Sequence, residues 1–387
     1  MSKYTLTFHL KQHTPIIHFQ PEQYGATLRA TELKPKLDRF ILKLMGGEAN
    51  VLDKWFVGGK NRQFPALDYK IKIQSITTSA QPIPEKFPLF FGNMHNEGDT
   101  GFREKQFKQT HASLSVEVFC LHADLLTKIG ECFQEFIFKH NFGSRQGKGF
   151  GSFTVTQGGE TDTLANLRKF KVQANDSQQL FAYIELFYKT LRSGCNGVKS
   201  PQSGRFERDF YAKPLIFAFA KQDGVQWEKK AIKQTYYPRD LSDQQLKHGN
   251  PDVLTVNGTP HIVKDLLGLS SAEAWKLPYK KAITKESISG DIDRFKSPIT
   301  FKPVKVGNRY EVYVLLDIVP AKFLQSEFAI KSNSDNRLKL SVWNGFDLQR
   351  FWDFALATNW DSYLTPQYAN HPIATIIKQM YKDLNEL

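Results

Sequence analysis

Residues 141–153 have the sequence Asn-Phe-Gly-Ser-Arg-Gln-Gly-Lys-Gly-Phe-Gly-Ser-Phe. The four glycines of this stretch allow positive φ angles and close approach of the backbone to a ligand. Arg145 and Lys148 add positive charge, and consecutive N–H groups in such a loop form a nest for phosphate oxygens. Phe142 and Phe150 are expected either to stack on a base or to wedge under the loop. The stretch therefore predicts a site for a nucleic-acid backbone, made of Gly143, Ser144, Arg145, Gly147, Lys148, Gly149, Phe150 and Gly151.

Two alternatives to this interpretation stay open. A P-loop has the pattern G-x-x-x-x-G-K-[ST] directly after a strand. Here three residues separate Gly143 from Gly147, Gly149 follows Lys148, and the loop follows a predicted helix. A nucleotide-binding enzyme would therefore need an atypical loop. The other alternative is a loop with a purely structural role.

Some segments around the loop show the two-residue hydrophobic period of strands, and others show the 3.6-residue period of helices. Their order is strand, helix, strand, strand, helix, strand, which is the ferredoxin-like pattern with an antiparallel sheet and both helices on one face. We expect this domain to span residues 1–160, with Pro35 in the first turn of its first helix. The predicted segments are Tyr4–Leu10, a helix from Pro35 to Met45, Leu67–Ile73, Leu114–Cys120, a helix over Ile129–Ile137, and Phe150–Val155.

A polar, glycine-containing stretch at residues 157–177 is predicted to be a linker, followed by a second α+β domain over 178–387. Its strand order does not follow from the pattern. Strands are predicted at Pro214–Ala220, Arg309–Val319 and Leu338–Val342, and helices at Gln179–Leu191, Phe346–Ala357 and Gln367–Leu384.

The composition indicates a globular basic protein. The formal charge of +13 and the pI of about 9.4 suit a polyanionic partner, either nucleic acid or an acidic membrane surface. Cys120, Cys132 and Cys195 have no C-x-x-C spacing, so neither a zinc site nor a redox pair is indicated, and we expect a reducing cytoplasm. The first residues lack the apolar core of a signal peptide, and no apolar window is long enough to span a membrane.

Three segments resemble a known family. Residues 143–152 are similar to the G-x-R-x-x-x-G-F-G loop of the RAMP superfamily of CRISPR-associated proteins. Thr14-Pro15 with Leu28–Leu33, and Leu267-Gly268-Leu269 with the segment Arg294–Ile299, resemble segments in the two halves of the first subunit of type III-B (Cmr) effector complexes. The loop after Thr14-Pro15 lacks the glycines usual there, and the second half shows no comparable glycine-rich loop unless residues 193–204 supply it.

The resemblance implies an α+β fold of two ferredoxin-like (βαββαβ) domains in tandem with antiparallel sheets. It also implies a subunit that binds guide RNA or the guide–target duplex in antiviral defence, together with other subunits of a type III effector complex. That family member is not known as the nuclease of its complex. We therefore expect no catalytic residues, no metal and no cofactor, the RNA as partner, and no membrane.

Further basic residues are candidates for RNA binding. Arg29, Lys34, Lys36 and Arg39 surround the start of the first helix, where orphan N–H groups favour phosphate. Arg103 and Lys105 lie among phenylalanines in the proline- and glycine-rich stretch 81–111, which suits a single strand. Arg294 and Lys296 flank Ser297-Pro298. A basic run beside glycines, which would complete a second phosphate site, is formed by Arg192, Lys199, Arg205 and Arg208.

Three histidines near the first strand raise an alternative function. Metal-independent RNA cleavage needs an acid and a base with pKa values near 7. His18, with Tyr24 and Lys34, would supply them in an endoribonuclease of the same superfamily that processes guide RNA; His9 and His13 are its neighbours. Related nucleases carry their glycine-rich loop near the C-terminus, which favours the noncatalytic interpretation here.

Overall fold

A computed structural model describes residues 3–17, 27–82, 108–156, 167–236, 259–275, 281–290, 292, 294–332 and 337–386. The chain divides into two compact units. Unit 1 consists of Met1–Phe181, Phe301–Leu315 and Leu387, and unit 2 of Ala182–Thr300 and Leu316–Glu386. The predicted linker ends close to the first crossing between the units, but nothing in the sequence pattern indicated that residues 301–315 belong to unit 1.

The first part of unit 1 follows the predicted order of strands and helices. Its sheet has the order β3-β4-β1-β5, and every pair of neighbours is antiparallel. The predicted α+β class with antiparallel sheets is therefore confirmed. The elements are β1 (Thr5–Gln12), β2 (Ile16–Ile17, paired with β4), α1 (Ala30–Leu44), β3 (Lys70–Pro82), β4 (Lys108–Phe119), α3 (Ala123–Lys139) and β5 (Phe153–Val155), with 3-10 turns at Glu48–Asn50, Asp53–Trp55, Gly59–Asn61 and Gln146–Lys148.

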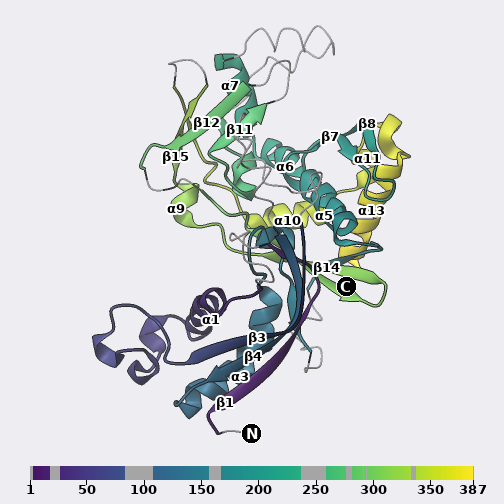
Figure 1. Ribbon diagram of the computed structural model, residues 1–387. Coiled ribbons are helices and arrows are strands. Elements are labelled where there is room, and N and C mark those ends of the chain that lie inside the picture. The colour runs from purple at the N-terminus through teal and green to yellow at the C-terminus, as the bar shows by residue number, and fades with distance from the viewer. Residues whose placement is uncertain are drawn as a thin grey trace. The chain divides into compact units, whose positions relative to one another are not determined.

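The core of unit 1 lies between one face of this sheet and the two helices (Figure 1). Alternate residues of β4 point into it because side chains of a strand alternate between its faces. The Phe8 ring of β1 stacks on Phe133 of α3, with 3.9 Å between ring centroids. The other face of the sheet presents polar side chains, such as Lys72 and Glu117, to solvent. Buried side chains from the helices and β4 are Leu33, Leu37, Ile41, Leu114, Val116, Val118, Ile129 and Ile137.

Two details of unit 1 differ from the sequence prediction. The ladder between β3 and β4 runs from Lys70–Phe119 to Pro82–Lys108, so both ends of the predicted loop 81–111 are strand. Helix α1 begins at Ala30, which places Pro35 inside the helix rather than in its first turn. Proline is tolerated there at the cost of one backbone hydrogen bond, because it has no N–H to donate.

A three-stranded sheet of order β13-β14-β6 completes unit 1; β6 is Lys169–Val172, β13 is Ile299–Val306 and β14 is Arg309–Leu316. Lys169 of β6 pairs with Glu311 of β14 at 2.6 Å and donates a hydrogen bond to the Tyr313 hydroxyl at 3.2 Å. Residues 301–303 of β13 form hydrogen bonds with residues at both ends of the glycine-rich loop.

Unit 2 is α+β as well. Its largest sheet has the order β11-β12-β15-β16 with antiparallel neighbours. The ferredoxin-like pattern is traced in unit 1 and stays a prediction for unit 2. The elements are α5 (Ser177–Arg192), β7 (Cys195–Lys199), β8 (Phe206–Ala212), α6 (Leu215–Gln222), β9 (Gln226–Trp227), α7 (Glu228–Tyr236), β10 (Pro260–His261), the 3-10 turn η6 (Lys264–Leu267), β11 (Ala272–Trp275), β12 (Lys281–Ser287), α9 (Ala321–Leu324), β15 (Glu327–Lys331), β16 (Leu338–Ser341), α10 (Leu348–Ala357), α11 (Trp360–Tyr363), α12 (Pro366–Ala369) and α13 (Pro372–Asn385).

Two predicted segments of unit 2 are wrong in type or extent. Residues 214–220 form the start of helix α6 instead of a strand, because a short continuous apolar run does not distinguish a buried helix from a buried strand. The helix predicted over Gln367–Leu384 is divided into α12 and α13. His371 caps α13 by accepting a hydrogen bond from the N–H of Ile373, and Pro372 occupies the first helical turn.

Candidate nucleic-acid interface

The glycine-rich loop connects α3 to β5 through a sharply folded backbone. Gly143, Gly149 and Gly151 have φ angles of 78°, 93° and 64°. A Cβ atom at residue 151 would lie 1.9 Å from the Phe142 carbonyl oxygen, and one at residue 143 would lie 2.8 Å from the Ile17 carbonyl oxygen. These two glycines are therefore required by close backbone approach within the protein itself.

Most of the N–H groups expected to form a phosphate nest are bonded inside unit 1. The Gly143 N–H donates to Glu32 Oε1 at 2.8 Å, and the Ser144 N–H donates to the Ile17 carbonyl at 2.9 Å. Within the loop, the N–H groups of Lys148 and Gly149 close the 3-10 turn, and the Gly151 N–H donates to the Pro15 carbonyl at 2.9 Å. The loop is thus a bonded scaffold, and the predicted nest of open backbone donors is wrong for these residues.

Thr14-Pro15, one of the two motifs noted near the N-terminus, anchors this scaffold. The buried Thr14 hydroxyl donates to the Gly149 carbonyl at 2.6 Å and accepts from the Ser152 N–H at 2.9 Å. Because the hydroxyl is fully inaccessible and satisfied on both sides, it ties both halves of the loop to the end of β1.

Helix α1 holds the loop from another side. Lys36 pairs with Glu32 at 2.8 Å, donates to Gln146 Oε1 at 2.8 Å and to the Asn141 carbonyl at 3.1 Å, and lies 4.7 Å from the centroid of the Phe142 ring. Glu32 belongs to the second N-terminal motif. The structure therefore brings the start of α1 and the loop together, and these contacts give Lys36 a supporting position beneath the loop.

A third support comes from β13, far along the chain. Asn141 Nδ2 donates to the Phe301 carbonyl at 2.7 Å, and the Ser152 hydroxyl donates to the Pro303 carbonyl at 2.7 Å. The buried Lys302 amine donates to the carbonyls of Ile137 and His140 at the end of α3. Burial holds the pKa of Lys302 well below its ordinary value. The sequence pattern held no signal for this pairing of a strand with a loop.

Both phenylalanines of the loop are wedges. Phe142 and Phe150 are fully buried, and the Phe150 ring stacks on Phe181 with 3.8 Å between centroids. Phe142 meets Phe136 and Phe153 edge-on. Of the two roles predicted for Phe150, base stacking is therefore wrong in this conformation and the structural wedge is correct.

Residues 145–148 form the half-exposed tip of the loop. Arg145 has a φ of 54°, and among the described residues it is the one non-glycine residue with positive φ. A side chain in the left-handed region costs about 1–2 kcal/mol, so the surrounding bonds must impose this conformation. Strain of this kind is typical of binding and switch positions. The tip carries Arg145 and Lys148, whose side chains are half-buried; the Arg145 Nε atom and the Lys148 amine are inaccessible to solvent in this conformation.

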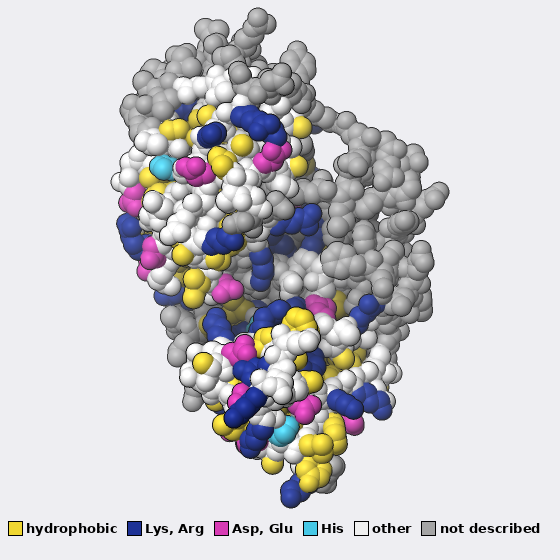
Figure 2. Space-filling model, turned by 90° about the vertical axis from the view of Figure 1, so that its left-hand side faces the viewer, with side chains coloured by type: hydrophobic (Ala, Val, Ile, Leu, Met, Phe, Trp, Pro, Cys, Tyr) yellow, Lys and Arg dark blue, Asp and Glu magenta, His cyan; other side chains and the backbone are white. Residues whose placement is uncertain are grey.

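The other predicted residues of unit 1 differ in their surroundings. Arg29 is the residue before the first turn of α1 and is half-exposed, and Arg39 is exposed on that helix. Lys34 pairs with Asp38 at 2.9 Å and donates to the Leu67 carbonyl at 2.8 Å, which gives it a structural position. Arg103 and Lys105 lie outside the described residues. Lys and Arg side chains recur over the face shown in Figure 2 with Asp and Glu among them, so charge alone marks no site.

In unit 2, Arg294 and Lys296 lie on an exposed segment with a fixed backbone. Both side chains are exposed, and Phe295 between them stacks on Phe323 with 4.2 Å between centroids. The Leu269 N–H donates to the Phe295 carbonyl at 2.9 Å, which joins the two motifs noted in this half of the chain. Gly268, with a φ of 117°, lies against the backbone of Ser297.

Comparison with protein-family models matches residues 3–195 to the Cmr1 N-terminal domain and residues 211–381 to the Cmr1 C-terminal domain. The chain belongs to the Cmr1 family. Its members are subunits of type III-B CRISPR effector complexes, so the chain is a subunit of such a complex. A search of curated proteins found no match. Among solved structures, Cmr1 from Pyrococcus furiosus in its apo form is similar at 10% identity and a TM-score of 0.39, over 87% of this chain and 89% of that one.

The histidines near β1 are the candidates for metal-independent RNA cleavage. His13 is buried: its Nδ1 accepts from the Lys305 N–H at 3.0 Å, so its Nε2 carries the proton and donates to the Thr154 hydroxyl at 2.7 Å. Burial, with Lys302 and Lys11 nearby, lowers the pKa of His13 to about 3. His13 is therefore a neutral structural residue. His18 and Tyr24 lie outside the described residues.

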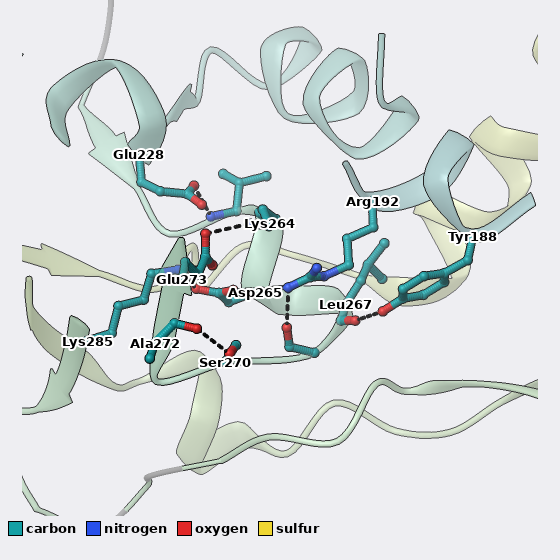
Figure 3. Close-up of polar contacts among 12 residues, drawn as sticks. Tyr188, Arg192, Glu228, Lys264, Asp265, Leu267, Ser270, Ala272, Glu273 and Lys285 are labelled. Carbon is teal, nitrogen blue, oxygen red and sulfur yellow. Dashed lines mark hydrogen bonds and ion pairs between the residues drawn. The ribbon is translucent and has the colours of Figure 1, made fainter. Parts of the chain in front are cut away.

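The sequence did not indicate that Arg192 belongs to a buried ion network in unit 2. Lys285 of β12 contacts Asp265 of η6 and Glu273 of β11, the latter at 2.8 Å, and Lys264 pairs with Glu273 at 2.6 Å (Figure 3). Arg192 lies 3.4 Å from Asp265 and donates to the Gly268 carbonyl at 2.7 Å. The network fixes the turn that precedes the Leu269–Phe295 bridge.

The charges of this network support one another. Burial alone would lower the pKa of Lys285, but Asp265 and Glu273 outweigh it and hold the pKa above its ordinary value. Burial likewise opposes ionisation of Glu273, yet Lys285 and Lys264 keep its pKa well below the usual range. Buried Glu228 accepts a hydrogen bond from the Val263 N–H at 2.8 Å, and burial raises its pKa.

The described residues show neither a metal centre nor a membrane helix. Over these residues, no group of three or more His, Cys, Asp or Glu side chains is arranged to hold a metal ion. Among the helices of the described part of the chain, none has the length and apolar character needed to cross a bilayer.

Proposed function

We propose that this chain is a noncatalytic, RNA-binding subunit of its type III-B effector complex, acting in antiviral defence in the cytoplasm. Its ligand is the backbone of guide RNA or of the guide–target duplex. The tip of the glycine-rich loop contacts this backbone through Arg145 and Lys148. The predicted residues Arg29, before α1, and Arg39, on α1, extend this contact within unit 1, and Arg294 and Lys296 form a separate contact of unit 2 with RNA.

The observation that supports the proposal most is the strained conformation of Arg145. A loop with a purely structural role would place glycine or asparagine at a left-handed position. Here an arginine is held there by a scaffold of bonds from Thr14, Glu32, Lys36 and Asn141. An arginine whose backbone is fixed in this way loses less entropy when its guanidinium grips a phosphate with two parallel hydrogen bonds.

Within the described part of the histidine cluster, His13 does not supply a general base, which supports the noncatalytic part of the proposal. A general base must keep a ring nitrogen available to the proton it takes. Both nitrogens of His13 are bonded within unit 1. Lys34, the cation considered as a catalytic partner, is paired with Asp38.

The test is equilibrium binding of a labelled single-stranded RNA of guide length to the full chain between about 50 and 300 mM salt. The double variant Arg145→Ala, Lys148→Ala is expected to bind more weakly for every sequence. The slope of log K against log salt should fall by about 0.7 for each phosphate that the variant leaves without its cation. RNA recovered intact from the mixtures supports the noncatalytic assignment.

The matched control removes the same charge elsewhere in unit 1. Lys43→Ala with Lys60→Ala alters one residue at the end of α1, about 16 Å along the helix axis from Glu32, and one in the 3-10 turn Gly59–Asn61. This control is expected to keep the wild-type affinity and slope. Equal losses in both double variants would mean that the loop contributes only general charge, and cleaved RNA would favour the endoribonuclease alternative.

A further inference from the structure

The hairpin of β7 and β8 presents an aromatic and basic surface in unit 2. The predicted basic run placed Arg192 together with Lys199, Arg205 and Arg208. The structure separates them: Arg192 joins the buried network, whereas the other three side chains are exposed on the hairpin. The turn between the strands is closed by hydrogen bonds from the Ser200 N–H to the Arg205 carbonyl and from the Gly204 N–H to the Ser200 carbonyl.

The two rows of the hairpin have opposite character. The inner row, which is buried, consists of Cys195, Val198, Phe210 and Ala212. In the outer row, Lys199 lies opposite Phe206 and Asn196 lies opposite Tyr211. Phe206 is 62% exposed and Tyr211 41% exposed. Because the inner row already packs on the core, the hairpin does not need these outer aromatic rings for its own burial.

The Phe206 ring has a defined position. A Cβ atom at residue 197 would lie 2.7 Å from Cζ and 3.0 Å from Cε1 of this ring, so the ring lies directly over the bare Gly197 backbone. Gly197 has a φ of 65° at the point where the register of the two strands shifts. One side of the ring is therefore supported by protein while most of the ring is open to solvent.

We infer that the outer face of this hairpin is a stacking platform for single-stranded RNA. Bases stack on Phe206 and Tyr211, and Lys199, Arg205 and Arg208 contact the adjoining phosphates. Exposed aromatic rings interleaved with cations are the arrangement that single-strand binding requires, since every base has a π face and every linkage a negative charge. The half-buried Glu207 belongs to the inner row, opposite Val198. Arg208 and Asp209 are both exposed and both lie in the irregular stretch, so Lys199 and Arg205 are the cations of the hairpin without a neighbouring carboxylate in sequence.

This inference rests on the proposed function only in taking RNA as the ligand; it assigns a second contact, in unit 2. The test again uses the full chain and labelled single-stranded RNA over a range of salt concentrations. Phe206→Ala is expected to weaken binding about tenfold while leaving the salt slope unchanged, because stacking releases no counterions. Phe206→Trp is expected to retain or improve affinity. Lys199→Ala with Arg205→Ala is expected to lower the slope.

The matched control is Phe64→Ala. Phe64 is 74% exposed in unit 1, and the neighbouring Arg62 is already paired with Glu48 and Asp53. Its removal is expected to leave RNA affinity unchanged. Thermal melting of every variant checks that it is folded, and both phenylalanines are exposed enough for the substitutions to be tolerated.

The outcomes separate the two proposals. Wild-type affinity in Phe206→Ala, with a loss in Arg145→Ala, Lys148→Ala, overturns the platform alone. The reverse result overturns the loop assignment alone and keeps the platform. If Phe206→Ala binds RNA normally but no longer assembles with the other subunits of the complex, the hairpin is a protein-docking surface and the inference is overturned. A full chain that binds no RNA at any salt concentration overturns both.

Discussion

Two substitutions of Arg145 distinguish the backbone strain at this residue from its contribution to RNA binding. Arg145→Ala and Arg145→Gly both delete the guanidinium and all its contacts, so those losses cancel when the two variants are compared. They differ in the backbone at a φ of 54°. Alanine keeps the left-handed strain of about 1–2 kcal/mol. Glycine relieves it but adds about 0.5–1 kcal/mol of backbone entropy to be lost on folding.

The net expectation is that Arg145→Gly is about 0.5–1 kcal/mol more stable than Arg145→Ala. For a folding unit of this size, that difference raises the melting temperature by about 1–4 °C. Both variants lose the same charged hydrogen bonds to phosphate. This loss is expected to weaken RNA affinity about tenfold in each variant. Differential scanning fluorimetry gives the first quantity, and a salt titration of RNA binding gives the second.

Two results would refute this reasoning in different ways. If Arg145→Gly melts no higher than Arg145→Ala, the loop does not store strain at residue 145. If Arg145→Gly is more stable and also binds RNA as the wild type does, the strain exists but does not serve phosphate binding. Stabilisation with loss of binding is the result that links the conformation to function.

Two further predictions concern stability. The pKa of His13 is lowered from its ordinary value of 6.5 to about 3 in the folded chain, so the neutral ring stabilises unit 1 above pH 6.5 and this contribution declines as pH falls toward 3. The decline amounts to about 2 kcal/mol in the free energy of unfolding by pH 5. When this free energy is measured by urea unfolding at several pH values, His13→Asn should lack that decline between pH 6.5 and about 5. An equal decline in the variant and the wild type would count against this reasoning. Lys285→Met leaves Asp265 and Glu273 buried without their shared cation and should cost about 3–5 kcal/mol in thermal unfolding. Lys331→Met, which breaks the exposed surface pair with Glu286, should cost far less, because solvent screens exposed ion pairs. Similar losses in both variants would mean that the buried network is not strongly coupled.

The local pattern of the sequence was sufficient for the elements of unit 1. Alternation along residues 114–120 and the stripe over 129–137 follow directly from which side chains face the core, so they predicted β4 and α3. Glycines beside Arg145 and Lys148 likewise indicated a special loop. The same reasoning failed at residues 214–220, where a fully apolar run has no period to distinguish helix from strand.

Tertiary structure alone decided what the loop is. Thr14, Glu32, Lys36 and residues 301–303 bond to it from positions far along the chain, and no local pattern encodes such partners. The bond to Glu32, with those to the Ile17 and Pro15 carbonyls, uses N–H groups that the sequence suggested were open. Packing also buries Phe150. The fold also places Arg192 in a buried network and leaves Phe206 exposed on the hairpin. Composition and hydrophobic period determine which residues are buried in the core. Whether a given side chain is accessible to a ligand depends on which distant segments fold against it.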